Sequence, residues 1–401
     1  MKHFTLPKEG GLIEKDIPAD ILHSYEKIRT EIYEQSSVAS DKIADIIVNA
    51  INSCKDRNFK LGLTTGKTPA SLYARLTQLY KEGKVSFKNV EVFSIDEYYP
   101  YGRKAPQSRN QILHTSLLNA VDIKEENIHI PDGSIAPEKV SEYCAEFDKL
   151  ARGMDLLVIG MGEHGQVGFN EAGSSPSSRT RTVLLSYQSR KRQGKNFNGD
   201  FKHTPSEAIT LGLDTMHSAK KIILMAWGED KANAVKNVVE NAADLNYPAS
   251  FLQTHPDITC YVDETAASLM TRVVSPWLVG PCDWTRKFIR KAVVWLCQEV
   301  HKPILKLTLN DYLEHSLGEL IDKFGPYDKI NIEVFNDLQH TITGWPGGKP
   351  NADDSQRPVP ALPFPKTVLI FSPHPDDDVI SMGGTFIRLV HQGHNVHVAY
   401  E

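Results

Sequence analysis

The chain has 401 residues, of which 40% are hydrophobic and 24% are charged. This is the composition of a globular protein of about two to three domains, and it excludes wholesale disorder, a collagen-like repeat and a small disulfide-stabilised fold. The 45 basic and 50 acidic residues give a net charge of -5, which argues against unspecific nucleic-acid binding. No apolar run reaches the roughly 18 residues of a membrane span, and the five dispersed cysteines favour a reduced, cytoplasmic protein.

Between residue 58 and about residue 269, short apolar runs alternate with amphipathic stretches. The expected strands are Phe59–Leu63, Val90–Ile95, Asp155–Ile159, Ala208–Leu213, Lys221–Ala226 and Ile258–Val262. The expected helices include Pro69–Lys81, Pro137–Leu150 and Asp230–Glu240. This alternation predicts an α/β fold with a parallel-rich sheet and helices on both faces. Ligands bind such sheets at the carboxyl ends of the strands, so a site is expected in the loops that follow them.

The rest of the chain has a different pattern. Helices are expected at Trp284–Val300 and Asp311–Lys323, and a partial Rossmann-like α/β unit at Thr367–Phe371, Gly384–His391 and Asn395–Tyr400. A proline- and glycine-rich segment between them can neither pair in a sheet nor continue a helix. The predicted organisation is a first domain at 1–275, a helical extension at 276–345, a linker at 346–366 and the start of another domain at 367–401.

The segment Leu61–Pro69 (LGLTTGKTP) ends a strand with a Gly/Thr turn and opens a helix. Backbone N–H groups at a helix N-terminus, together with hydroxyls and a lysine, suit a phosphate group. A nucleotide P-loop needs four residues between its glycines, and Gly62 and Gly66 are separated by three, so ATP binding is disfavoured. A phosphate-ester site and a plain helix cap both stay open.

The segment Val92–Tyr98 (VFSIDEY) places Asp96 and Glu97 at the end of an apolar strand. An acid in a partly desolvated crevice can act as a general base with a raised pKa. An acid at such a position can equally be a helix N-cap. The residues alone give the two interpretations equal weight.

The segment Gly160–Glu171 (GMGEHGQVGFNE) follows the strand expected at Asp155–Ile159. Its four glycines indicate a tortuous loop or a close approach of the backbone to a ligand. It is not a dinucleotide fingerprint, because Gly168 and the polar residues after it argue against the helix that the fingerprint requires. The loop brings His164 and Glu171 into one stretch as a candidate acid/base pair, although a lone His164 would be a solvated loop histidine.

These segments, with SSRTR at 177–181, occur in the order and spacing of glucosamine-6-phosphate deaminases over about residues 21–270. The chain resembles that family more than the 6-phosphogluconolactonases, which share the phosphate loop and the fold but not the ending Phe169-Asn170-Glu171. The resemblance implies conversion of glucosamine 6-phosphate to fructose 6-phosphate and ammonia in amino-sugar catabolism. It also implies a cytoplasmic homo-oligomer, often a hexamer, that needs no cofactor.

The resemblance implies a role for each matching residue. Asp96 would shuttle a proton between C2 and C1, and Glu171 would assist ring opening. The residues implied to bind phosphate or substrate are Thr65, Gly66, Lys67, Thr68, Lys195 and Lys231. An allosteric sugar phosphate would bind Ser174 and Arg181.

The sequence departs from the family at the ring-opening loop, which usually reads Asp-Gly-His and here reads His164-Gly165-Gln166. Gln166 cannot exchange a proton near neutral pH, whereas His164 offers a relocated imidazole. Lys195 aligns with a family arginine and lacks its bidentate fork. We therefore expect slowed or rerouted ring opening. The alternatives are a catalytically impaired sugar-phosphate-binding or regulatory module and, more remotely, a 6-phosphogluconolactonase-type hydrolase.

The segment Ser372–Asp378 (SPHPDDD) follows the strand expected at Thr367–Phe371. An imidazole and carboxylates at a strand end suit zinc, and a capped turn is the plain alternative. The motif resembles the opening of PIG-L-type zinc N-deacetylases, which implies His374 and Asp377 as ligands and Asp376 as the general base. In that family, the remaining histidine ligand normally lies much further along the chain, beyond the position of Glu401. Zinc is thus expected only in a complete downstream domain, and the sequence is expected to be a fragment of a longer two-enzyme protein.

Overall fold

A computed structural model describes residues 11–12, 17–197, 199, 201–343, 366–391 and 393–400. The chain forms two compact units, one of Ile17–Val274 and one of Met1–Asp16 together with Ser275–Glu401. The predicted linker at 346–366 lies outside the described residues, apart from Lys366. Within the described ranges, no helix combines the length and apolarity that a membrane crossing requires.

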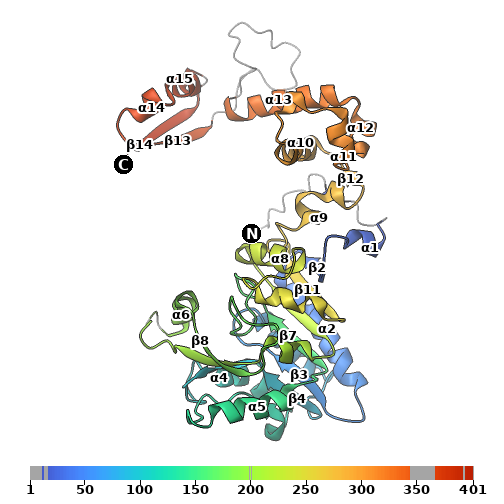
Figure 1. The fold of residues 1–401 in the computed structure, drawn as a ribbon, viewed down its shortest axis with the longest axis vertical. Coiled ribbons are helices and arrows are strands. Elements are labelled where there is room, and N and C mark those ends of the chain that lie inside the picture. Colours follow the sequence, from blue (N-terminus) through green and yellow to red (C-terminus); the bar gives the residue numbers. More distant parts are fainter. Residues whose placement is uncertain are drawn as a thin grey trace. The chain divides into compact units, whose positions relative to one another are not determined.

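The described part of the first unit is built on a seven-stranded sheet with the order β2-β11-β10-β7-β3-β4-β6 (Figure 1). The strands are β2 Arg29–Tyr33, β3 Phe59–Leu63, β4 Val90–Ser94, β6 Ile128–His129, β7 Leu156–Gly160, β10 Ile222–Ala226 and β11 Ile258–Asp263. All neighbouring pairs are parallel, which confirms the predicted parallel-rich sheet. The edge strands β2 and β6 were not predicted.

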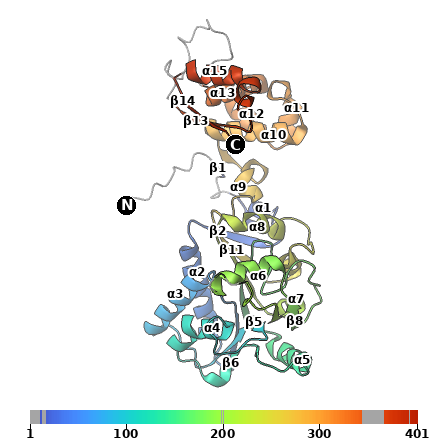
Figure 2. The ribbon, with the colours of Figure 1, turned by 90° about the vertical axis from the view of Figure 1, so that its left-hand side faces the viewer.

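Helices cover both faces of this sheet. Successive residues of β7 face opposite sides, so that Leu157 and Ile159 enter one core while Leu156 and Val158 enter the other. The first core includes α5 and α8, and the second includes α2 and α3, which lie side by side in Figure 2. The helices of this unit are α1 Ala19–Leu22, α2 Ser36–Ser53, α3 Ala70–Lys81, α4 Arg109–Ser116, α5 Val140–Ala151, α6 Tyr187–Gly194, α7 Leu213–His217, α8 Ala232–Val239 and α9 Thr271–Val274.

A second, antiparallel sheet has the order β5-β9-β8, with β5 Asp96–Tyr99, β9 Glu207–Thr210 and β8 Arg181–Leu184. The strand expected at Ala208–Leu213 is therefore present, but its assignment to the parallel sheet was wrong. Its Thr210 pairs with Asp96 on one side and with Arg181 on the other. An apolar run predicts a strand, whereas its partner and direction depend on contacts that are distant in sequence.

The second unit contains a helical part and a small α/β part. Its elements are β1 Gly11–Leu12, β12 Cys282–Asp283, α10 Arg286–Val300, α11 Leu309–Glu314, α12 Gly318–Phe324, α13 Tyr327–Thr343, β13 Thr367–Ser372, α14 Asp377–Ile380, α15 Gly383–His391 and β14 Asn395–Tyr400. The single helix expected at Asp311–Lys323 was wrong, because Ser316 has φ = 60° and interrupts the helical backbone. β1 pairs with β12, although residues 1–275 were predicted to form one domain.

Asp155 connects the amino-terminal ends of three neighbouring strands. Its carboxylate accepts hydrogen bonds from Arg57 Nη1 (2.6 Å), the Lys60 backbone N–H (3.0 Å) and Lys220 Nζ (2.8 Å), and its side chain is only 7% exposed. Burial opposes ionisation, but the hydrogen bonds from Arg57 and Lys220 hold the pKa of Asp155 well below its usual range. The ionised carboxylate thus stabilises the folded unit.

We predict that Asp155→Asn lowers the free energy of unfolding by about 1.5–3 kcal/mol at pH 7, because several hydrogen bonds to a charged acceptor are weakened. The folded-state pKa lies below the unfolded value of about 3.9, so this stabilisation is complete above that pH and is lost as the pH falls. Urea titrations at pH 7 and pH 3, read by hydrogen exchange in peptides from β7, measure both differences.

The control variant is Asp257→Asn, which removes the exposed pair between Lys221 and Asp257 at the start of the next strand. We expect a loss below about 1 kcal/mol, because exposed ion pairs contribute little. Equal losses for the two variants would contradict the role assigned to Asp155.

Candidate active site

The carboxyl ends of β4, β3, β7 and β10 lie next to one another at one edge of the parallel sheet. From β3 the chain continues outward to β4 and β6, and then returns to the opposite side of β3 with β7. Such a reversal of strand order opens a crevice at the carboxyl ends of the strands, where α/β proteins bind ligands. The motifs selected from the sequence follow these strands.

The loop between β3 and α3 presents its backbone to this edge. Gly66 has φ = 111°, and a Cβ atom there would meet nothing within 4 Å. The Thr65 hydroxyl is buried and has no hydrogen-bond partner among the described residues, while Lys67 is exposed. The Thr68 carbonyl accepts a hydrogen bond from Trp227 Nε1 (2.9 Å), which joins this loop to the end of β10. The loop therefore has open space at Gly66 and a buried hydroxyl at Thr65 that neither donates nor accepts a hydrogen bond among the described residues.

Asp96 is buried at the end of β4, where it begins β5. Its Oδ1 lies 3.6 Å from Arg109 Nε, and neither atom has a hydrogen-bond partner among the described residues. The Arg109 guanidinium lies over the rings of Tyr98 and Phe169, at 4.8 and 5.3 Å from their centres. Burial raises the pKa of Asp96 above its usual value, and the charge of Arg109 offsets this only in part.

The neighbouring acid, Glu97, has a different environment. Its carboxylate accepts hydrogen bonds from the backbone N–H groups of Tyr98 (2.8 Å), Arg109 (2.9 Å) and Asn110 (2.9 Å), the last two at the start of α4. Burial raises the pKa of Glu97 to about 7, against the opposing effect of these donors. Glu97 is thus the acid that stabilises a helix N-terminus, and Asp96 is the acid whose Oδ1 is ion-paired with Arg109 but accepts no hydrogen bond from the described residues.

The loop Gly160–Glu171 passes directly over Asp96. At Gly168, where φ = 56°, a Cβ atom would lie 2.8 Å from Thr210 Oγ1 and 3.5 Å from Asp96 Oδ2, so the backbone requires glycine. The Gln166 side chain turns back into the loop, where its Oε1 accepts a hydrogen bond from the His164 backbone N–H (2.9 Å). The His164 side chain is exposed. The loop thus holds the Gln166 amide in place and leaves the His164 imidazole in solvent.

Glu171 lines a cavity of about 600 Å³ together with Ser174 and Arg181. Its Oε2 accepts a hydrogen bond from the Ser186 backbone N–H (3.1 Å), and its buried Oε1 has no hydrogen-bond partner among the described residues. Arg181 donates to Ser174 Oγ (3.3 Å) and to Asn170 Oδ1 (3.0 Å). Burial lowers the pKa of Arg181. The structure thus brings Glu171 to the two residues for which the resemblance implied an allosteric role.

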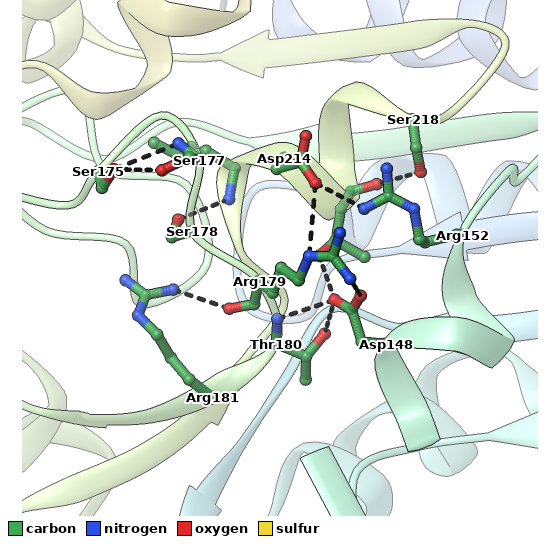
Figure 3. A network of polar contacts seen from close by, with 12 residues as sticks. Asp148, Arg152, Ser175, Ser177, Ser178, Arg179, Thr180, Arg181, Asp214 and Ser218 are labelled. Carbon is green, nitrogen blue, oxygen red and sulfur yellow. Dashed lines mark hydrogen bonds and ion pairs between the residues drawn. The ribbon is translucent and has the colours of Figure 1, made fainter. Parts of the chain in front are cut away.

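Asp148 anchors the segment that carries Arg181. Asp148 Oδ1 accepts hydrogen bonds from the backbone N–H and the hydroxyl of Thr180, both at 2.9 Å. Figure 3 shows Arg179 directed towards Asp148 and Asp214, with Arg181 extending to the opposite side of the segment. These contacts fix the backbone on both sides of Thr180 and so direct Arg181 into the cavity.

Besides Lys67, the two other lysines predicted to bind phosphate or substrate differ in their surroundings. Lys231 lies in the turn between β10 and α8, with its Nζ 2.8 Å from Asp230 Oδ2 and 3.8 Å from Glu163 Oε1. Lys195 follows α6 and is exposed. The edge of the sheet therefore gathers Thr65–Thr68, Asp96, Lys231 and the loop through Glu171.

In the second unit, His374 Nδ1 lies 2.9 Å from Asp377 Oδ2, and Asp376 precedes α14 as its N-cap residue. An imidazole and a carboxylate suit zinc, which needs at least three protein ligands. Within the described ranges, no group of three or more His, Cys, Asp or Glu side chains is arranged to hold a metal.

Sequence reasoning did not select Arg109, Glu163 or Asp148. The one local signal near Arg109 is Ser108, whose hydroxyl accepts a hydrogen bond from the Gln111 backbone N–H (3.0 Å) and so begins α4. This signal predicts a helix start, but it does not indicate that the helix places a guanidinium beside Asp96.

Residues 34–260 match the family described as glucosamine-6-phosphate isomerases/6-phosphogluconolactonase. The chain belongs to this family. Residues 369–400 match the GlcNAc-PI de-N-acetylases (PIG-L). The residues of the sheet edge described above therefore belong to the isomerase/lactonase part, and the His374–Asp377 pair belongs to the short second match.

Two relatives match this chain over different lengths. A glucosamine-6-phosphate deaminase-like protein of Bacteroides thetaiotaomicron is 47% identical over 97% of the chain, which spans 59% of that relative's length. A glucosamine-6-phosphate deaminase of Thermoanaerobacter pseudethanolicus is 37% identical over 61% of the chain and 94% of the relative.

Solved structures agree with this assignment. A monomeric glucosamine-6-phosphate deaminase is 31% identical, with a TM-score of 0.57 over 60% of this chain and 100% of that one. A devB protein, at 18% identity and a TM-score of 0.51 over 61% of this chain and 99% of that one, shares the fold.

We predict that Arg109→Gln raises the pKa of Asp96 further, because the variant removes the cation that favours the ionised carboxylate. Carboxyl-carbon NMR titration measures this pKa. Arg109→Lys keeps the charge and is expected to leave the value near that of the wild type. Since loss of a buried ion-pair partner costs about 3–5 kcal/mol, circular dichroism must first show that both variants are folded. An unchanged Asp96 pKa in folded Arg109→Gln would contradict the assignment.

Proposed function

We propose that the chain converts glucosamine 6-phosphate to fructose 6-phosphate and ammonia in amino-sugar catabolism. The observation that carries the proposal is the buried Asp96, whose Oδ1 has no hydrogen-bond donor among the described residues, at the sheet edge that also holds the Thr65–Thr68 loop and Lys231. An aldose–ketose isomerisation of a sugar phosphate needs groups that bind the phosphate and an acid that moves the proton, both within reach of one substrate. Membership of the family and the similarity to curated deaminases support the same reaction.

In the proposed reaction, the Thr65–Thr68 loop and Lys231 hold the phosphate, and Glu171 assists opening of the sugar ring. Asp96 then takes the proton from C2 and delivers it to C1, so that the amine-bearing carbon becomes an imine that water hydrolyses to the ketone and ammonia. A carboxylate suits this shuttle because both transfers occur on one face of the substrate. The raised pKa of Asp96 strengthens it as a base.

A second candidate function is binding of a sugar phosphate without turnover. The observation that favours it is the Gln166 side chain, which is held within the loop and cannot transfer a proton, while His164 is exposed. Under the deaminase proposal, the same observation makes ring opening the slow step.

We further propose that Ser174 and Arg181 bind a second sugar phosphate in the cavity that they share with Glu171. The PIG-L-like segment suggests removal of an N-acetyl group, which would expose the amine that deamination releases. A cytoplasmic location and a homo-oligomeric assembly are part of the proposal and rest on the family resemblance.

Asp96→Asn is expected to lower release of ammonia from glucosamine 6-phosphate by roughly 10²–10⁴-fold, because the amide cannot shuttle the proton. A coupled assay for ammonia and fructose 6-phosphate measures this loss. The control is Asp56→Asn, which neutralises an exposed aspartate before β3 and should leave turnover unchanged. Normal turnover by Asp96→Asn would disprove the mechanism, and no turnover by a wild type that binds the substrate would favour the second function.

Gln166→His is expected to raise turnover, because it places a proton-transferring imidazole inside the loop. His164→Ala tests the alternative route, and it should slow the wild type if His164 assists ring opening. In the Gln166→His background, His164→Ala should then have little effect. Steady-state kcat for the four proteins measures both routes, and a Gln166→His variant slower than the wild type would contradict a limiting ring opening.

A further inference from the structure

Two cations from different elements approach one carboxylate beside the Thr65–Thr68 loop, which is the proposed phosphate loop. Lys231 Nζ lies 3.8 Å from Glu163 Oε1, and Arg192 Nη1 lies 3.9 Å from Glu163 Oε2. Lys231 comes from the turn after β10, Arg192 from α6 and Glu163 from the loop after β7. Each cation thus approaches a different oxygen of the same anionic group, which is the arrangement that two cations adopt around a phosphate.

The contacts of Glu163 are loose enough to be exchanged. Both distances exceed the 2.7–2.9 Å of a charge-assisted hydrogen bond, and the Glu163 side chain is 40% exposed. Lys231 is better held, because its Nζ is also 2.8 Å from Asp230 Oδ2, and Arg192 donates to Ser189 Oγ (3.3 Å). Rotation of Glu163 into water would therefore leave the two cations in place.

This cluster adjoins the phosphate loop. Trp227, which precedes the turn carrying Lys231, donates a hydrogen bond to the Thr68 carbonyl (2.9 Å). A Cβ atom at Gly160, where the loop carrying Glu163 begins, would lie 3.3 Å from the Thr68 side chain. The elements that carry Lys231 and Glu163 are thus both packed against the phosphate loop.

We propose that Arg192 and Lys231 together bind the phosphate group of the sugar phosphate, and that Glu163 is the internal counter-ion that this phosphate displaces. The inference rests on the proposed function and names a residue pair for its phosphate site. A phosphate monoester carries close to two negative charges near pH 7 and three acceptor oxygens, so it engages both cations better than the single charge of Glu163 does. Arg192 supplies the guanidinium fork that Lys195 lacks.

The experiment measures binding of inorganic phosphate and of fructose 6-phosphate to the full chain by calorimetry. Arg192→Gln is expected to weaken both by roughly 10- to 100-fold, because a charge-assisted contact is lost. Glu163→Gln is expected to tighten both, because the competing carboxylate is removed. The matched control is Lys191→Gln, which removes an exposed charge next to Arg192 and should leave both affinities unchanged.

The double variant Arg192→Gln/Glu163→Gln tests the coupling directly. If the two residues interact at one site, Glu163→Gln should tighten binding less in the Arg192→Gln background than in the wild type. Additive effects, or weaker binding by Glu163→Gln alone, would overturn the role of Glu163. A loss confined to Lys195→Gln, with Arg192→Gln binding like the wild type, would overturn the role of Arg192.

Turnover separates this inference from the proposed function. Arg192→Gln should raise KM for glucosamine 6-phosphate and leave kcat near the wild-type value, because the contact is made equally in the ground and transition states. A wild type that binds phosphate with the expected Arg192 dependence but releases no ammonia supports the inference while disproving the proposed function. An active Arg192→Gln enzyme with unchanged KM supports the function and disproves the inference.

Discussion

Parallel pairing of β4, β3, β7 and β10 is the constraint on which the candidate site depends. Because all four strands run in one direction, the segments that follow them must emerge at the same edge of the sheet. Glycines in the loop after β7 permit close packing there. A side chain at Gly160 would press on Thr68, and one at Gly168 would collide with Thr210.

The loop after β7 connects the three parts of this edge. Its Glu163 faces Lys231 and Arg192, its Gly168 passes over Asp96, and its last residue, Glu171, lines the cavity that contains Arg181. A change in this loop can therefore reach Lys231 and Arg192, the buried acid and the cavity together. The His164 and Gln166 departures from the family pattern lie in the middle of this loop.

Two adjacent buried acids have different properties because their partners differ. Glu97 loses water but gains three backbone N–H donors, one from Tyr98 and two from Arg109 and Asn110 at the start of α4. Asp96 loses water and gains one guanidinium, 3.6 Å from its Oδ1, and that oxygen accepts no hydrogen bond from the described residues. Desolvation raises the pKa of both, so the difference between them lies in their donors.

The sequence by itself determined the α/β class, the strands of the parallel core apart from its edges, and the family, because these depend on local apolar patterns and on motif order. It did not determine that β9 belongs to a separate antiparallel sheet, or that Ser316 divides a helix. The same limit applied to the site. For Asp96 and Glu97, the residues alone gave equal weight to a general base and to a helix cap. Only the tertiary structure assigned Arg109 to one and the α4 N-terminus to the other, because burial and donors come from residues distant in the chain.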